Sequence, residues 1–294
     1  MMIKSGEVSK TAAFIAIKFR ALMQVPEYQK LFDKKTIAFY DHQISHFPQR
    51  LRQIVKLTDL KKIRDVLISL EEWILPGDLL HILTRKWYLH NTLKAVIDKG
   101  CRQIIVLGAG FDHLAYCAAQ TGMIALEIDK PATSLLKKKI VTHYSVNSSN
   151  LIINSCSGTA ESIMNIIRQN EQLNPNKKVF IVTEGFWDYQ SEHNNKILAQ
   201  QLAGYFKAGI RIASTVFNLN KLTPFHRFIF EQSIRLVGEQ LTFLTSKKAI
   251  ANLFKNHGIT TIEFQQARDL KKRTIPSAKS LKVLKGFGMI QLQR

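Results

Sequence analysis

The chain has 294 residues, 46% of them hydrophobic, and its 42 lysine and arginine residues against 22 aspartate and glutamate residues give a net charge of +20. This length and apolar content suffice for one large domain with its own core, while three cysteines without CxxC spacing argue against a disulfide framework and fit a reducing cytoplasm. We expect no membrane span, because no apolar run approaches the roughly 20 residues that one requires, and no signal peptide, because Lys18 and Arg20 interrupt the apolar run near the N-terminus.

The first quarter of the chain is predicted to be mostly helical. Across residues 8–75, apolar side chains recur at helical spacing. The clearest run is Ile54, Leu57, Leu60, Ile63, Val66, Leu67 and Leu70. Pro76-Gly77 then breaks the pattern. We interpret residues 1–90 as a helical cap that packs on a main domain formed by residues 91–294.

From about residue 90, strand and helix patterns alternate. Strands are predicted at 103–107, 123–128, 151–154, 178–183, 209–216, 259–264 and 286–292. Helices are predicted at 91–99, 132–140, 159–170, 194–206 and 247–256, with a helical insertion near 222–240. This alternation predicts an α/β fold, in which helices cover both faces of a mostly parallel sheet. The last two strands are close enough in sequence to include an antiparallel one.

The strand predicted at 103–107 ends abruptly in Gly108-Ala109-Gly110. Small residues at this point let backbone N–H groups approach a ligand closely. The next strand ends in acid, Glu127-Ile128-Asp129, and Asp129 lies 21 residues after Gly108. An acid in this place can accept hydrogen bonds from both hydroxyls of a ribose. Together the two features predict a pocket for a nucleoside cofactor.

The residues after the loop distinguish between two cofactors that the spacing leaves open. His113 stands where the dinucleotide fingerprint has its third glycine, which disfavours close docking of a pyrophosphate. Asp112 places negative charge near a helix start, where it repels phosphate and can hold an amine. The loop therefore fits S-adenosylmethionine, which has no phosphate, better than NAD, and an NAD-dependent oxidoreductase is the less favoured alternative.

Several motifs beyond the loop occur in an order that resembles the leucine carboxyl methyltransferase-like family of class I S-adenosylmethionine-dependent methyltransferases. They are Arg85-Lys86-Trp87-Tyr88, Leu107-Gly108-Ala109-Gly110-Phe111-Asp112, Glu127-Ile128-Asp129-Lys130-Pro131 and Thr183-Glu184-Gly185-Phe186-Trp187-Asp188-Tyr189, with weaker similarity at Ser9 to Ala21 and Gly238 to Phe243. The resemblance implies a Rossmann-like fold with a seven-stranded, mostly parallel sheet and an N-terminal helical cap.

The resemblance also implies roles for individual residues. Arg85 would pair with the carboxylate of the cofactor's methionine tail, since its guanidinium fork matches a carboxylate. Gly108 and Gly110 would let the cofactor lie against the loop. Asp129 would bind the ribose hydroxyls, with its neighbour Glu127 as the less favoured ligand. Glu184 would lie near the cofactor's amino group or the site of methyl transfer, and Arg20 would close over the cofactor or hold an acidic substrate.

The chain departs from the family's pattern at three places. His113-Leu114 replaces a Thr-Arg pair, and Lys86 replaces a threonine. The stretch Asn154 to Ser157 lacks the acid that often holds the adenine, so adenine recognition is expected to rest on Ser155 and Cys156 or on backbone groups. No cluster in the sequence has the spacing of metal ligands, and no metal is expected.

The implied reaction is O-methylation of a carboxylate, on a small molecule or a protein C-terminus. A carboxylate is ionised at neutral pH and needs no strong general base, so no catalytic residue is assigned. If the acceptor is a hydroxyl, Tyr189, His113 and His226 are weak candidates for a base. The charge leaves a second hypothesis, a basic nucleic-acid-binding protein or RNA methyltransferase. Against it, the basic residues are dispersed in short groups such as Lys137-Lys138-Lys139.

Overall fold

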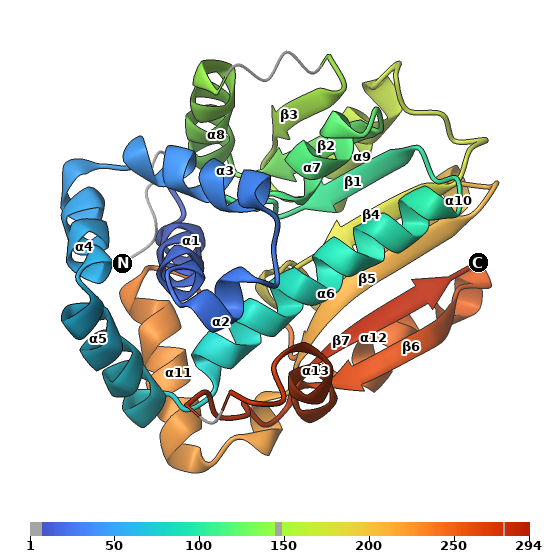
Figure 1. Ribbon diagram of the computed structural model, residues 1–294. Helices are drawn as coiled ribbons and strands as arrows, with labels where there is room; N and C mark the ends of the chain where they lie inside the picture. The colour runs from blue at the N-terminus through green and yellow to red at the C-terminus, as the bar shows by residue number, and fades with distance from the viewer. Residues whose placement is uncertain (1–7, 145–148, 279) are drawn as a thin grey trace.

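The computed structural model describes residues 8–144, 149–278 and 280–294 (Figure 1). A seven-stranded sheet forms its centre, with the strand order β3-β2-β1-β4-β5-β7-β6. The strands are β1 (Gln103–Leu107), β2 (Ile124–Asp129), β3 (Leu151–Ser155), β4 (Val179–Thr183), β5 (Ile210–Phe217), β6 (Thr260–Gln266) and β7 (Phe287–Gln293). Only β7 runs antiparallel to its neighbours, β5 and β6. The sequence predicted all seven strands, each to within two residues, and the antiparallel strand.

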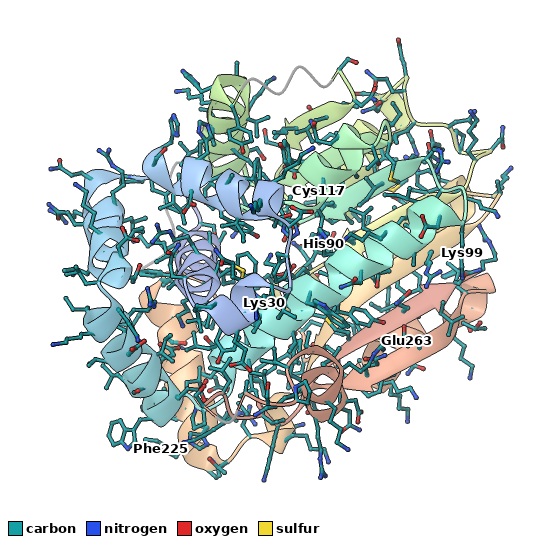
Figure 2. All side chains as sticks on the ribbon, in the orientation of Figure 1. Lys30, His90, Lys99, Cys117, Phe225 and Glu263 are labelled. Carbon is teal, nitrogen blue, oxygen red and sulfur yellow. The ribbon has the colours of Figure 1, made fainter. Side chains whose placement is uncertain are left out.

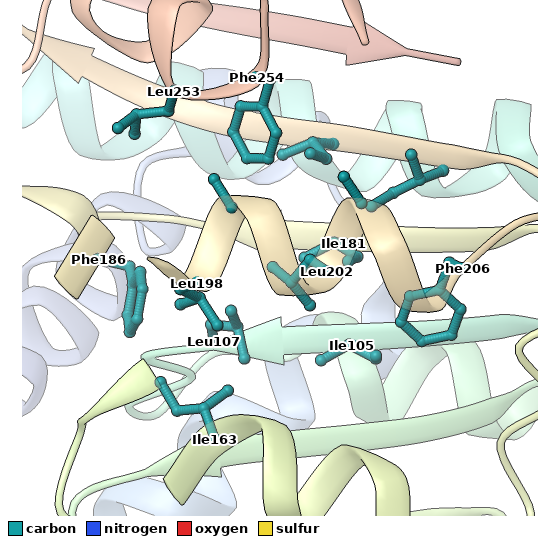
Figure 3. Packing of buried hydrophobic residues seen from close by; sticks show 14 of the residues in the cluster. Ile105, Leu107, Ile163, Ile181, Phe186, Leu198, Leu202, Phe206, Leu253 and Phe254 are labelled. Carbon is teal, nitrogen blue, oxygen red and sulfur yellow. The ribbon is translucent and has the colours of Figure 1, made fainter. Parts of the chain in front are cut away.

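Helices cover both faces of the sheet because successive side chains of its strands point to opposite sides. Ile105 and Leu107 of β1 pack with the helices α9 (Ala160–Gln169), α10 (Glu192–Tyr205) and α12 (Lys247–Phe254), as Figure 3 shows for α10. Ile104 and Val106 face the other way, toward α6 (Asp78–Asp98), α7 (Leu114–Gln120) and α13 (Ala267–Thr274). The expected α/β architecture is confirmed.

The helix expected at 91–99 is the second half of a much longer one. Helix α6 begins at Asp78, directly after Gly77, and crosses the sheet along one face (Figure 1). It is buried nearly all round, so its apolar residues do not follow one stripe and its first half carries no clear helical period. Residue 90, the boundary expected between cap and main domain, lies within this helix.

Five helices precede α6: α1 (Lys10–Met23), α2 (Pro26–Gln29), α3 (Lys34–Ser45), α4 (Gln49–Asp59) and α5 (Lys61–Ile74). Side chains of Ser9 and Asp33 cap the first turns of α1 and α3. Phe19 and Leu22 of α1 pack in one apolar cluster with Leu80 and Leu83 of α6. The remaining helices are α8 (Pro131–His143) and α11 (Pro224–Leu236). Across the described part of the chain, no helix combines the length and apolar character needed to cross a membrane.

Candidate active site

A cavity of about 330 Å³ opens at the carboxyl ends of the central strands. This is where ligands bind in open parallel sheets. The loop from Gly108 to Asp112 forms one wall, and the ends of β2 and β4 contribute Asp129 and Glu184. Arg85 and Lys86 come from α6, and the first turns of α1 lie across the cavity. Five parts of the chain therefore converge on one space.

The glycines of the loop are required by both conformation and space. Gly108 and Gly110 have φ of +67° and +46°, a backbone region that residues other than glycine rarely adopt. A Cβ on Gly108 would lie 3.2 Å from the ring of Phe186, and one on Gly110 would lie 3.0 Å from the Cβ of Ala12. Only glycine at these two positions therefore lets the loop pack this closely against its neighbours. The close packing keeps the loop backbone next to the cavity.

Asp129 and Glu127 end the same strand but lie in different surroundings. Asp129 lines the cavity, and its two carboxylate oxygens accept hydrogen bonds of 2.6 Å from the backbone N–H groups of Gly110 and Lys130. Burial raises its pKa, and these two hydrogen bonds oppose the rise. Glu127 is buried in an ion pair with Lys137, at 2.7 Å, and is not among the residues that line the cavity. Burial raises the pKa of Glu127 to about 7.

Two basic and two acidic side chains form a buried network at the inner end of the cavity. Lys86 Nζ donates hydrogen bonds to Asp112 and, at 3.0 Å, to Glu184. Arg85 Nε lies 2.8 Å from Glu184 Oε1, but the geometry forms no hydrogen bond and leaves this buried N–H without one. Burial by itself would raise the pKa of Asp112, yet Lys86 beside it holds that pKa well below the usual range. The network thus keeps the Asp112 carboxylate ionised.

The other predicted site residues divide between the cavity and the rest of the molecule. Cys156 lines the cavity, whereas Ser155 is exposed at the end of β3 and does not. Tyr189 also lines it, and burial raises the pKa of this phenol. Arg20 lies outside the lining and pairs with Asp41, at 2.9 Å, and with Asp59.

His113 is fully buried at the start of α7 and does not line the cavity either. Burial lowers its pKa to about 3, so the ring is neutral near pH 7. Its Nε2 lies 3.2 Å from His90 Nδ1, and Tyr40 OH lies 3.3 Å from its Nδ1. Within the described residues, these two histidines and Cys117 are the one group close enough to hold a metal ion (Figure 2). The hydrogen bond between the rings of His90 and His113 accounts for their close approach without an ion.

Two lining residues to which the sequence assigned no role contact each other. Ser9 Oγ donates a hydrogen bond of 2.9 Å to Glu239 Oε1. The bond joins the residue before α1 to the segment after α11, and both residues line the cavity. The signal for Glu239 was present in the Gly-Glu segment at Gly238. The signals for Ser9 were the weaker family similarity of the segment that it begins and its place before a helix.

Comparison with known proteins gives a family and a fold. Residues 29–203, more than half of the chain, match the leucine carboxyl methyltransferase family. A DUF574 family protein from Streptomyces avermitilis MA-4680 is similar in structure, with a TM-score of 0.60 at 12% identity, over 87% of this chain and 95% of that one. A putative methyltransferase from Thermobifida fusca YX gives 0.58 at 13% identity, over 87% and 92%. At these identities the shared feature is the fold. No curated protein matches the chain.

Proposed function

Because the chain belongs to the leucine carboxyl methyltransferase family, and is thus an S-adenosylmethionine-dependent methyltransferase, we propose that it methylates a carboxylate of a small molecule or of a protein C-terminus. The proposal has two parts, the placement of the cofactor and the nature of the acceptor. Each is supported by different contacts in the cavity and is tested separately.

The cavity residues fit the cofactor at three points. The buried N–H of Arg85 Nε lacks a hydrogen bond and is available to the carboxylate of the methionine tail. Gly108 and Gly110 keep the loop backbone beside the cavity, where any Cβ would press on Phe186 or Ala12. Asp129 has a carboxylate at the end of β2, where it would hold the ribose hydroxyls. Glu184 would then face the amino group of the same tail.

His113 supports this cofactor over NAD. In a dinucleotide site, the third glycine lets the helix pack closely and bring its N-terminus to the pyrophosphate. Here the imidazole of His113 fills that position at the start of α7 and is enclosed by Tyr40 and His90. Asp112 accepts a hydrogen bond of 2.7 Å from the backbone N–H of Leu114. The carboxylate of Asp112 thus already binds the backbone N–H group that would otherwise donate a hydrogen bond to a phosphate.

The acceptor proposal is carried by one observation: each carboxylate that lines the cavity already has donors. Asp112 and Glu184 are bound by Lys86, Asp129 by two backbone amides, and Glu239 by Ser9. The described residues that line the cavity include no histidine. No strong general base is therefore in place to ionise a hydroxyl. A carboxylate acceptor needs none, because it is ionised at neutral pH.

When bound, S-adenosylmethionine supplies a methyl group on a positively charged sulfur. The part played by the protein is then alignment and exclusion of water. The elements α1 and α6 lie across the cavity and hold its apolar walls, including Ile15 and Ala16, against the loop.

The first test is calorimetric titration of the purified protein with S-adenosylhomocysteine, with NAD as the control. We expect binding of the first alone. The second is transfer of a labelled methyl group to a panel of small carboxylic acids and peptides, each paired with its amide. We expect label on the acids only, released by mild alkali as methanol because the product is an ester. Label that resists alkali, or that appears equally on the amides, would contradict a carboxylate acceptor.

A further inference from the structure

Helix α5 has its apolar side turned away from the protein. Its residues Val66, Leu70 and Trp73 are 65%, 48% and 76% exposed, while Arg64 and Glu72 on the opposite side are 8% and 5% exposed. An amphipathic helix on the surface of a globular protein normally has the reverse arrangement. Helix α5 itself lies at the outer edge of the molecule, away from the sheet (Figure 1).

Polar contacts fix this orientation. Glu72 Oε2 accepts hydrogen bonds from the backbone N–H groups of Gly77, at 3.2 Å, and Lys282, at 3.0 Å. Next to it, Glu71 pairs with Lys18 of α1 at 2.6 Å. Rotating α5 to bury its apolar side would break these contacts and expose their partners. The outward stripe is therefore part of the folded structure.

The stripe continues beyond α5 onto the end of α4. Its members are the exposed apolar residues Ile54, Leu57, Leu60, Val66, Leu67, Leu70, Trp73 and Ile74, and we call them the outer stripe. Exposed apolar side chains that gather on two neighbouring helices are typical of an interaction site. No member lines the cavity, so the outer stripe is separate from the cofactor site.

Positive charge accompanies the stripe. Five lysine and arginine residues on α4 and α5 are exposed: Arg50, Arg52, Lys56, Lys61 and Lys62. The exposed acids on the same helices are Asp59, which Arg20 already holds, and Asp65. The whole chain carries +20. A second copy of the chain would meet like charge at this face, whereas an anionic surface would be attracted.

We propose that the outer stripe docks the protein on an anionic lipid surface. Exposed apolar side chains beside a basic segment are the signature of a helix that lies in the plane of a membrane interface. Trp73, the most exposed of the outer stripe, is a residue type enriched at the boundary between headgroups and acyl chains. Helix α5 has 14 residues and spans about 21 Å, so it lies on the surface and does not cross it.

The test is co-sedimentation of the full chain with vesicles of neutral phosphatidylcholine, alone or mixed with anionic phosphatidylglycerol. We expect binding to the mixed vesicles, weakened by added salt, and little binding to neutral ones. The triple variant V66S/L70S/W73S should lower the partition coefficient by at least about tenfold. The double variant K61E/K62E should lower it on mixed vesicles as well, because each basic residue near the surface adds about 1 kcal/mol, or roughly fivefold.

The matched control is Ile262→Ser, which removes an exposed apolar residue from β6, outside the outer stripe. It should bind vesicles like the parent chain. Unchanged binding of S-adenosylhomocysteine by each variant would establish that it is folded. Two results would overturn the proposal: absence of binding to anionic vesicles, or equal binding by the triple variant. Concentration-dependent self-association that the triple variant abolishes, without vesicle binding, would assign the stripe to a second copy instead.

Discussion

The carboxylate of Asp129 accepts a hydrogen bond from the backbone N–H of Gly110, with 2.6 Å between Oδ2 and N. This bond joins the end of β2 to the glycine loop after β1, two strands that pair in parallel register. It fixes the loop at the position where the ribose would lie. The same side chain would thus shape the loop and bind the cofactor.

We expect Asp129→Ala to raise the Kd for S-adenosylhomocysteine by at least about tenfold. Hydrogen bonds to a charged group contribute roughly 1.5–3 kcal/mol, which corresponds to that change or more. Titration calorimetry measures it directly. The control is Ser155→Ala, at an exposed position that does not line the cavity, where the affinity should be unchanged. Equal affinities for Asp129→Ala and the parent chain would remove Asp129 from the ribose site.

Arg85→Lys should weaken the cofactor about tenfold or more, even though it keeps the positive charge. A lysine cannot reproduce the guanidinium fork that matches a carboxylate. It would also alter the ion pair between Arg85 and Glu184. The change is measured with S-adenosylhomocysteine and compared with adenosine, which lacks the amino-acid tail.

Adenosine should bind the Arg85→Lys variant and the parent chain equally. A loss that is the same for both ligands would mean that Arg85 supports the fold of the pocket and does not bind the tail. The matched control is Arg20→Ala. Because Arg20 pairs with Asp41 and Asp59 outside the cavity, we expect cofactor affinity to be retained.

Gly110→Ala should impair cofactor binding as well as stability. The left-handed backbone costs a residue with a Cβ roughly 1–2 kcal/mol, and here the Cβ would also press on Ala12. Gly122→Ala provides the comparison, since Gly122 has φ of +83° but no heavy atom within 4 Å of the added Cβ. We expect Gly122→Ala to lower stability in urea unfolding without changing affinity. A loss of affinity in both variants would point to global destabilisation.

The sequence was sufficient to predict the sheet and the glycine loop because both depend on local patterns. An apolar run that ends in glycine specifies a strand and a turn whatever surrounds it. The sequence favoured Asp129 over Glu127 but kept both in the ribose site, since residues two apart in a strand point to the same side. The difference comes from Lys137 of α8, which covers Glu127 and leaves Asp129 at the open end of the sheet.

The orientation of α5 was also beyond the sequence. Its apolar period predicted a helix correctly but carried no information on which side meets the protein. That side is set by Glu72, whose partner Lys282 lies 210 residues further along the chain. Arg20 was likewise expected near the cofactor, and the acids that bind it, Asp41 and Asp59, come from other helices. Such long-range polar pairs have no signature in a single sequence.

The buried His113 predicts a loss of stability at mildly acidic pH. Its pKa is about 3 in the folded chain because burial disfavours the charged ring, against roughly 6.5 when the chain is unfolded. Between these values the unfolded state binds more protons than the folded state, so the free energy of unfolding rises with pH. As pH falls through this window, the folded chain therefore loses stability. At pH 5 the loss from one such histidine is about 2 kcal/mol relative to pH 7.5.

Urea unfolding at pH 7.5 and pH 5 checks this for the parent chain and for His113→Gln. The variant cannot take up a proton at this position, so its stability should fall by about 2 kcal/mol less between the two pH values. His81, whose pKa burial lowers to about 4, should behave in the same way when replaced by glutamine. The comparison uses the difference between pH values, so a constant destabilisation of the variant cancels. The same pH dependence in His113→Gln and the parent chain would contradict a buried, neutral His113.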